Sequence, residues 1–69
     1  MIEELIKYFE FQMRVMDKIG KGEHETKMHI ADKCFGAVEF IDQLGVIKTK
    51  ELTELWQEWS VRLWEKVKE

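Results

Sequence analysis

The sequence contains no proline and only one cysteine, Cys34, among its 69 residues. Without proline, no position in the chain forces a helix to kink or to end for want of a backbone N–H group. A single cysteine cannot form an internal disulfide, and no Cys/His spacing typical of a structural zinc site is present. Because a domain of this size buries only about 60% of its unfolded surface, we expect stability to come from helix packing or self-association.

The chain also lacks an excess of positive charge and any long apolar run. The formal net charge is −3, so the chain as a whole does not attract phosphate backbones or anionic membranes. No stretch approaches the roughly 18 apolar residues that a membrane span requires. The first residues, Met1-Ile2-Glu3-Glu4, are acidic where a signal peptide would be basic. Together with the lone cysteine, these features predict a cytoplasmic protein with no membrane partner.

Glycine marks two breaks in a chain that is otherwise rich in helix-forming residues. One break is Gly20-Lys21-Gly22 and the other is Gly45, and glycine is suited to helix ends because it accepts the left-handed conformation without steric cost. We predict three helices, near 2–19, 23–44 and 49–68. Their similar lengths and short connections favour antiparallel neighbours. The sequence therefore predicts a single all-α domain over residues 1–69, a three-helix bundle built as an antiparallel helical hairpin plus a third docked helix.

The first predicted helix carries two apolar stripes side by side. One consists of Ile2, Leu5, Ile6, Phe9, Met13 and Met16. The other consists of Tyr8, Phe11, Val15 and Ile19. Together they cover about 220° of the helix circumference, whereas a surface helix needs little more than 100°. The second stripe is therefore either buried against another helix of the bundle or is a seam for self-association.

The second predicted helix has a heptad seam and two residues that do not follow it. The seam contains Ile30, Cys34, Ala37, Ile41 and Leu44, and a further seam of Met28, Ala31, Phe35 and Val38 runs beside it. Cys34 is interpreted as an inert core residue. Gly36 is either a tolerated glycine, a point of close approach for another helix or a break in this helix, and Phe40 falls among polar residues.

Three tryptophans lie within nine residues of the third predicted helix. At about 100° per residue, Trp56 and Trp59 share a face with the leucines of this helix and are assigned to the core. Trp64 falls at the edge of that face, and Val61 projects to the polar side. Trp64 is therefore either wrapped by the chain or kept for an interface, where tryptophan is enriched.

These patterns predict a small acidic, non-catalytic protein–protein interaction module, such as an adaptor, inhibitor or regulatory subunit. Its partner would be a second copy of the chain, another protein, or both, and homodimerisation is the favoured expectation. The candidate interface residues are Tyr8, Phe11, Val15, Ile19, Phe40, Val61 and Trp64.

Two alternatives come from other classes of protein. A small helical DNA-binding regulator would need a basic recognition helix, but the third predicted helix carries as many acidic as basic residues. A metal-dependent helical hydrolase fragment would use the only metal-like group of side chains, His24, Glu25, His29 and Asp32. These side chains are interpreted as a solvated polar face, because ligands would have to converge from more than one element.

Catalytic machinery is also missing from the sequence. There is no glycine-rich phosphate loop and only one serine, Ser60. We therefore expect no enzymatic activity, no catalytic residue, no cofactor, no metal and no nucleic-acid partner.

Overall fold

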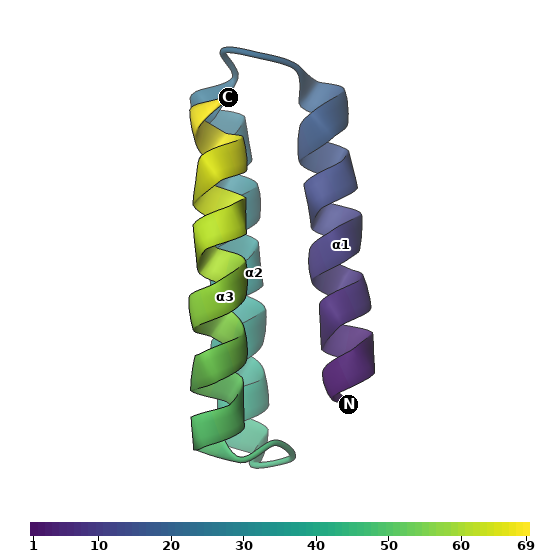
Figure 1. The fold of residues 1–69 in the computed structure, drawn as a ribbon, viewed down its shortest axis with the longest axis vertical. Coiled ribbons are helices and arrows are strands. Elements are labelled where there is room, and N and C mark those ends of the chain that lie inside the picture. Colours follow the sequence, from purple (N-terminus) through teal and green to yellow (C-terminus); the bar gives the residue numbers. More distant parts are fainter.

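The computed structural model describes all 69 residues and consists of three helices without strands. They are α1 (Ile2–Ile19), α2 (His24–Leu44) and α3 (Thr49–Lys68). Figure 1 shows them as an up-down-up bundle with the two chain ends at opposite ends of the molecule. The predicted all-α class is confirmed, and the predicted helix bounds agree with the structure to within one residue.

The three helices do not pack equally closely. α2 and α3 form the tightest pair, and α1 contacts both of them; in Figure 1, α1 stands beside the α2–α3 pair. The bundle measures 36 × 17 × 15 Å. The predicted three-helix bundle is thus confirmed; its tightest hairpin is α2–α3, and α1 docks against both of these helices. No helix combines the length and the low polarity needed to cross a membrane.

The two glycine breaks use different backbone conformations. Gly45 has φ 69° and ψ 20°, and its N–H donates to the carbonyls of Ile41 and Asp42, which is the left-handed helix end expected from sequence. Gly20 has φ 92° with ψ 180°, so the left-handed cap expected there is wrong. Its positive φ with extended ψ is a conformation that essentially only glycine adopts. The chain therefore leaves α1 in an extended rather than a coiled-back path.

The start of α3 also differs from the sequence expectation. Threonine is a favoured N-cap residue, so the sequence predicts Thr49 as the N-cap of this helix. Thr49 is instead the first helical residue, and Lys48 occupies the cap position without a side-chain hydrogen bond. The Thr49 hydroxyl instead donates to Oδ1 of Asp42 at 3.1 Å. This bond ties the first turn of α3 to the last turn of α2.

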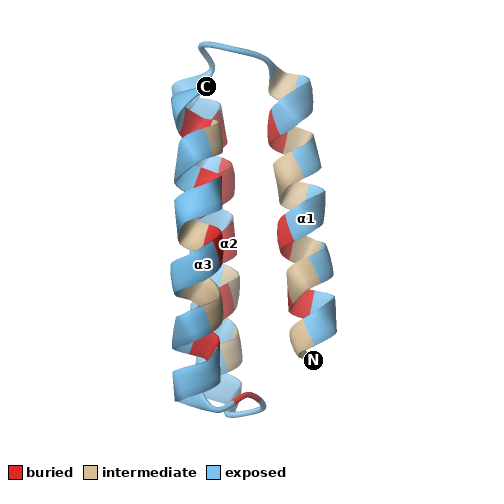
Figure 2. Ribbon diagram, in the orientation of Figure 1, coloured by how far each residue is buried: buried red, intermediate tan, exposed pale blue.

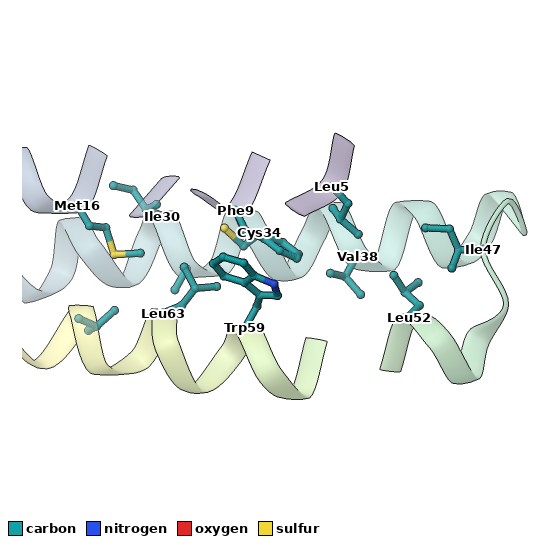
Figure 3. Close-up of a cluster of buried hydrophobic side chains, with 12 residues drawn as sticks. Leu5, Phe9, Met16, Ile30, Cys34, Val38, Ile47, Leu52, Trp59 and Leu63 are labelled. Atoms are coloured by element: carbon teal, nitrogen blue, oxygen red, sulfur yellow. The ribbon is translucent and has the colours of Figure 1, made fainter. Parts of the chain in front are cut away.

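The core is a single cluster along the bundle axis, and Figure 2 shows its buried positions as inward-facing bands on each helix. Phe9 is fully buried near its centre, with its ring centroid 5.9 Å from Trp56 and 5.5 Å from Trp59. Cys34 and Leu63 lie beside it in Figure 3. The core assignments of Trp59 and Cys34 are confirmed, since both are buried, while Trp56 is half-buried at its edge.

Charged side chains lie around this core, and one ion pair joins two helices. Lys66 on α3 pairs with Asp17 on α1, and hydrogen bonding to that carboxylate raises the pKa of Lys66. Opposite charges four residues apart on a helix are predicted to pair, and Glu58 and Arg62 do so at 2.9 Å. The same spacing in α1 predicts the pairs Glu3–Lys7 and Glu10–Arg14, but neither forms. The Arg14 guanidinium instead lies 6.0 Å from the Phe11 ring centroid.

Candidate interaction surface

The seven residues predicted as an interface separate into two groups. Tyr8, Val15 and Ile19 are half-buried and pack against the core. The remaining four are exposed: Phe11, Phe40, Val61 and Trp64. Most of the second stripe of α1 therefore helps to hold the bundle together, because α1 contacts both neighbours, and only Phe11 of that stripe opens to solvent.

Two apolar residues of the second predicted seam of α2, Met28 and Phe35, are exposed to a similar extent as Trp64. The exposed fractions are 42% for Met28, 46% for Phe35 and 42% for Trp64. Phe35 is nonetheless packed on one side, with its ring centroid 5.6 Å from that of Trp56. Met28 and Phe35 are seven residues apart, so they lie on the same side of α2, two turns from each other.

A groove of about 190 Å³ lies between α2 and α3 next to Phe35. It is lined by Phe35, Val38, Glu39, Asp42, Thr49, Leu52, Thr53 and Trp56. The volume is below the roughly 300–1,000 Å³ of small-molecule sites but well above the roughly 30 Å³ share of one water. The groove therefore suits protruding side chains of a protein partner better than a cofactor.

The register of α2 on α3 follows from two contacts. Phe35 contacts Trp56. Asp42, seven residues after Phe35 on α2, contacts Thr49, seven residues before Trp56 on α3. Because the helices are antiparallel, Met28, seven residues before Phe35, lies level with Leu63, seven residues after Trp56. Met28 is therefore placed beside Trp64. Trp64 lies eleven residues, about three turns, beyond the groove residue Thr53 and so returns to the same side of α3.

By this projection Met28, Phe35, Thr53, Trp56 and Trp64 lie on the same side of the α2–α3 hairpin, which we call the α2–α3 face. It runs along the groove between the two helices. Sequence periodicity placed Met28 and Phe35 on the second apolar seam of α2, but their exposure shows that α1 leaves this side of the hairpin uncovered. Phe11 and Phe40 do not belong to it. They lie on sides of α1 and α2 that point away from α3, by the same projection that places Phe35 toward α3.

A larger hollow of about 470 Å³ lies at the end of the bundle where the N-terminus meets the loop between α2 and α3. Its apolar lining is aliphatic or thioether, from Met1, Ile2, Val46 and Ile47, and its other residues are charged. No aromatic side chain contributes to it. We therefore place the candidate interface at the aromatic α2–α3 face and not at this end.

The titratable residues of the bundle do not converge on a reaction site. Cys34 is completely buried, and desolvation raises its pKa to about 11, which leaves it as a neutral thiol. Burial, with a smaller contribution from Cys34, also raises the pKa of Tyr8. His24 and His29 are exposed, and no three His, Cys, Asp or Glu side chains group closely enough to hold a metal ion.

Lys27 is the one charged residue of the core, and the sequence patterns did not identify it. Only 3% of its surface is exposed, yet it makes no ion pair or side-chain hydrogen bond. No fully enclosed side-chain nitrogen or oxygen lacks a partner, so its ammonium group must reach solvent at the end of a buried stem. Lys27 therefore behaves as a long apolar side chain with a hydrated tip.

Comparisons of the chain with protein-family models, curated proteins and solved structures found no match.

Proposed function

We propose that this protein is a non-catalytic protein–protein interaction module that works as a homodimer through the α2–α3 face. The observation that supports this proposal is the exposure of Met28, Phe35 and Trp64 on this face, each of which leaves more than 40% of its surface exposed. Tryptophan is enriched among residues that dominate binding energy, and methionine adapts its shape to a partner. Exposed apolar patches are a feature of interaction surfaces.

A second copy is the partner that the charges of this face favour. Its α2 rim is acidic, with Asp32, Glu39 and the groove residue Asp42. Its α3 rim carries Lys50 and Lys68 and no acidic residue on the side of Trp64, by projection at about 100° per residue. A surface that carries both signs can complement itself, whereas a strongly basic or strongly acidic partner would match only half of it.

The available area is compatible with a dimer of moderate affinity. A face of 36 × 17 Å covers about 600 Å² on each copy, or about 1,200 Å² for two. Specific protein interfaces bury about 1,200–2,000 Å² in total, and those at the low end are often transient. The proposed dimer therefore lies at the low end of this range, where complexes are often transient.

Sedimentation velocity or light scattering on the wild type and on Trp64→Glu tests the proposal. The wild type should approach twice its 8.3 kDa mass as concentration rises from about 1 to 500 µM. Trp64→Glu should weaken the dimer by at least about 30-fold, the effect of losing a binding hot spot of about 2 kcal/mol. Circular dichroism should show unchanged helicity, because Trp64 is already substantially exposed.

Phe11→Glu is the matched control, since it places the same charge at an exposed aromatic position outside the α2–α3 face. It should leave the dimer intact. Dissociation by Phe11→Glu but not by Trp64→Glu would move the interface to the α1–α2 side and overturn the proposal. A wild type that stays monomeric throughout would also overturn it.

The other sequence-based expectations remain predictions. These are the adaptor, inhibitor or regulatory role, the cytoplasmic location, and the DNA-binding and hydrolase alternatives. No structural observation favours either alternative.

A further inference from the structure

The charge pattern of the α2–α3 face determines how two copies can meet. In a two-fold symmetric dimer the same face is used twice, and the axis can run along the helices or across them. An axis along the helices places α2 of each copy on α3 of the other with the same ends together. An axis across the helices places α2 on α2 and α3 on α3 with the ends reversed.

The reversed arrangement brings like charges together. With α3 on a reversed α3, Lys50 near one end meets Lys68 near the other. With α2 on a reversed α2, Asp32 near the middle meets its own copy, and Glu39 approaches Glu25. Like charges placed opposite each other across an interface weaken binding and select against that arrangement.

The same-ends arrangement pairs opposite charges on both sides of the axis. In the register given by the Phe35–Trp56 and Asp42–Thr49 contacts, Lys50 is level with Ile41, so it can reach Glu39 or Asp42 of the second copy. At the other end, Lys68 is level with Glu23 and can reach Glu25 of the second copy. We propose, on the basis of the proposed homodimer, that each copy packs its α2 against α3 of the other with the same ends together.

The apolar residues fit this arrangement as well as the charges do. Met28 and Trp64 lie at the same level of the bundle, so rotation about an axis along the helices brings Trp64 of each copy against Met28 of the other. A methionine sulfur against an aromatic ring is a favourable contact. Phe35 and Trp56 lie two helical turns closer to the other end of the bundle. There, Phe35 of each copy comes close to Trp56 of the other. The two α2–α3 hairpins then form a central four-helix unit, with the α1 helix of each copy on the outside.

Charge substitutions distinguish the two arrangements by the sign of their effect. Lys50→Glu should weaken the same-ends dimer on the order of tenfold, because symmetry places the new repulsion against Glu39 twice. Adding Glu39→Lys to Lys50→Glu should restore the affinity. In the reversed dimer Lys50→Glu would instead strengthen binding, because the new carboxylate would meet Lys68. Strengthening, or failure of the double variant to restore affinity, would overturn the same-ends arrangement.

Distances between spin labels provide a second, independent readout. A label at Lys21→Cys, in a Cys34→Ala background, lies in the loop at one end of the bundle. The same-ends dimer should give a label separation of about 10–25 Å, as expected for packed helices 8–10 Å apart with flexible label arms. The reversed dimer would separate the labels by about the 36 Å length of the bundle. A long distance in a protein that still dimerises refutes only the arrangement, whereas absence of any dimer refutes the proposed function.

Discussion

At the scale of single residues, burial explains the behaviour of the two chemically unusual side chains, Cys34 and Lys27. Both lie on the inner side of α2. The thiol can remain neutral inside the core, so Cys34 is fully enclosed. An ammonium group cannot be left unpaired away from water without a large free-energy cost, so Lys27 extends its tip to the surface. Neither side chain is placed for nucleophilic chemistry.

The raised pKa of Cys34 makes an alkaline loss of stability expected. The thiol titrates near 9.0 when unfolded and near 11 in the folded protein, so between these values the unfolded chain loses a proton that the folded chain keeps. The free energy of unfolding should therefore fall as pH rises through this window, by about 2 kcal/mol at pH near 10.5. Urea titrations at pH 7.5 and 10.5, with reductant, measure the loss.

Cys34→Ala is the control for this experiment, because it retains the alkaline titration of every other group. Its stability should fall by about 2 kcal/mol less than that of the wild type over the same pH interval. Equal losses in the two proteins would show that the thiol does not contribute.

At the scale of helices, α2 has three structural roles. It contributes to the core, to the groove and to the acidic rim of the α2–α3 face. Gly36 lowers the helix propensity of α2, but the helix runs unbroken from His24 to Leu44. A Cβ atom at Gly36 would meet nothing within 4 Å. The prediction that another helix of the chain approaches closely at Gly36 is therefore wrong. Gly36 is a tolerated glycine on an open side of α2.

Gly36→Ala should accordingly stabilise the protein by about 0.5–1 kcal/mol, because alanine has the higher helix propensity and limits the unfolded chain more. For a domain of this size, that corresponds to a rise in Tm of a few degrees. Thermal unfolding followed by circular dichroism measures it. The reverse change at the next position, Ala37→Gly, should lower Tm. An unchanged or lower Tm in Gly36→Ala would indicate a constraint at this site that the bundle does not contain.

At the scale of the whole molecule, the bundle is thin. Only 13 of 69 residues are buried, and the aromatic side chains of α3 are divided between the core and the surface. Trp59 is buried, Trp56 is half-buried against Phe9, and Trp64 is exposed. A second copy on the α2–α3 face would remove the exposed aromatic area from water and add to the stability of each subunit.

The melting temperature should therefore depend on protein concentration. Binding of a second copy to the folded chain stabilises it by mass action, by about 2.7 kcal/mol when the partner is at 100 times its dissociation constant. Between about 5 and 500 µM, Tm of the wild type should rise by several degrees, given about 4–8 °C per kcal/mol for small domains. Scanning calorimetry or fluorescence melts at matched heating rates would measure this rise.

Trp64→Glu serves as the comparison, with a Tm that stays constant over the same concentrations. A wild-type Tm that is equally constant would argue that folding and association are independent, and would contradict the proposed dimer.

The sequence by itself determined the helices. The gap between the glycines and the spacing of apolar residues located all three to within one residue, because the 3.6-residue period and the glycine breaks are local properties. The same periodicity identified Phe9, Cys34, Trp59 and Leu63 as core. It also left Trp64 at an edge, where the structure exposes it.

The tertiary structure alone decided which apolar stripe is covered. Two stripes on α1 and two seams on α2 exceed what one chain can bury, and helix periodicity does not specify which neighbour takes which side. Once α1 docks across one side of the α2–α3 hairpin, Tyr8, Val15 and Ile19 are drawn toward the core. Met28 and Phe35 are left open on the other side. The candidate surface depends on this choice of partners between helices, which arises from packing across the bundle and not from any local sequence pattern.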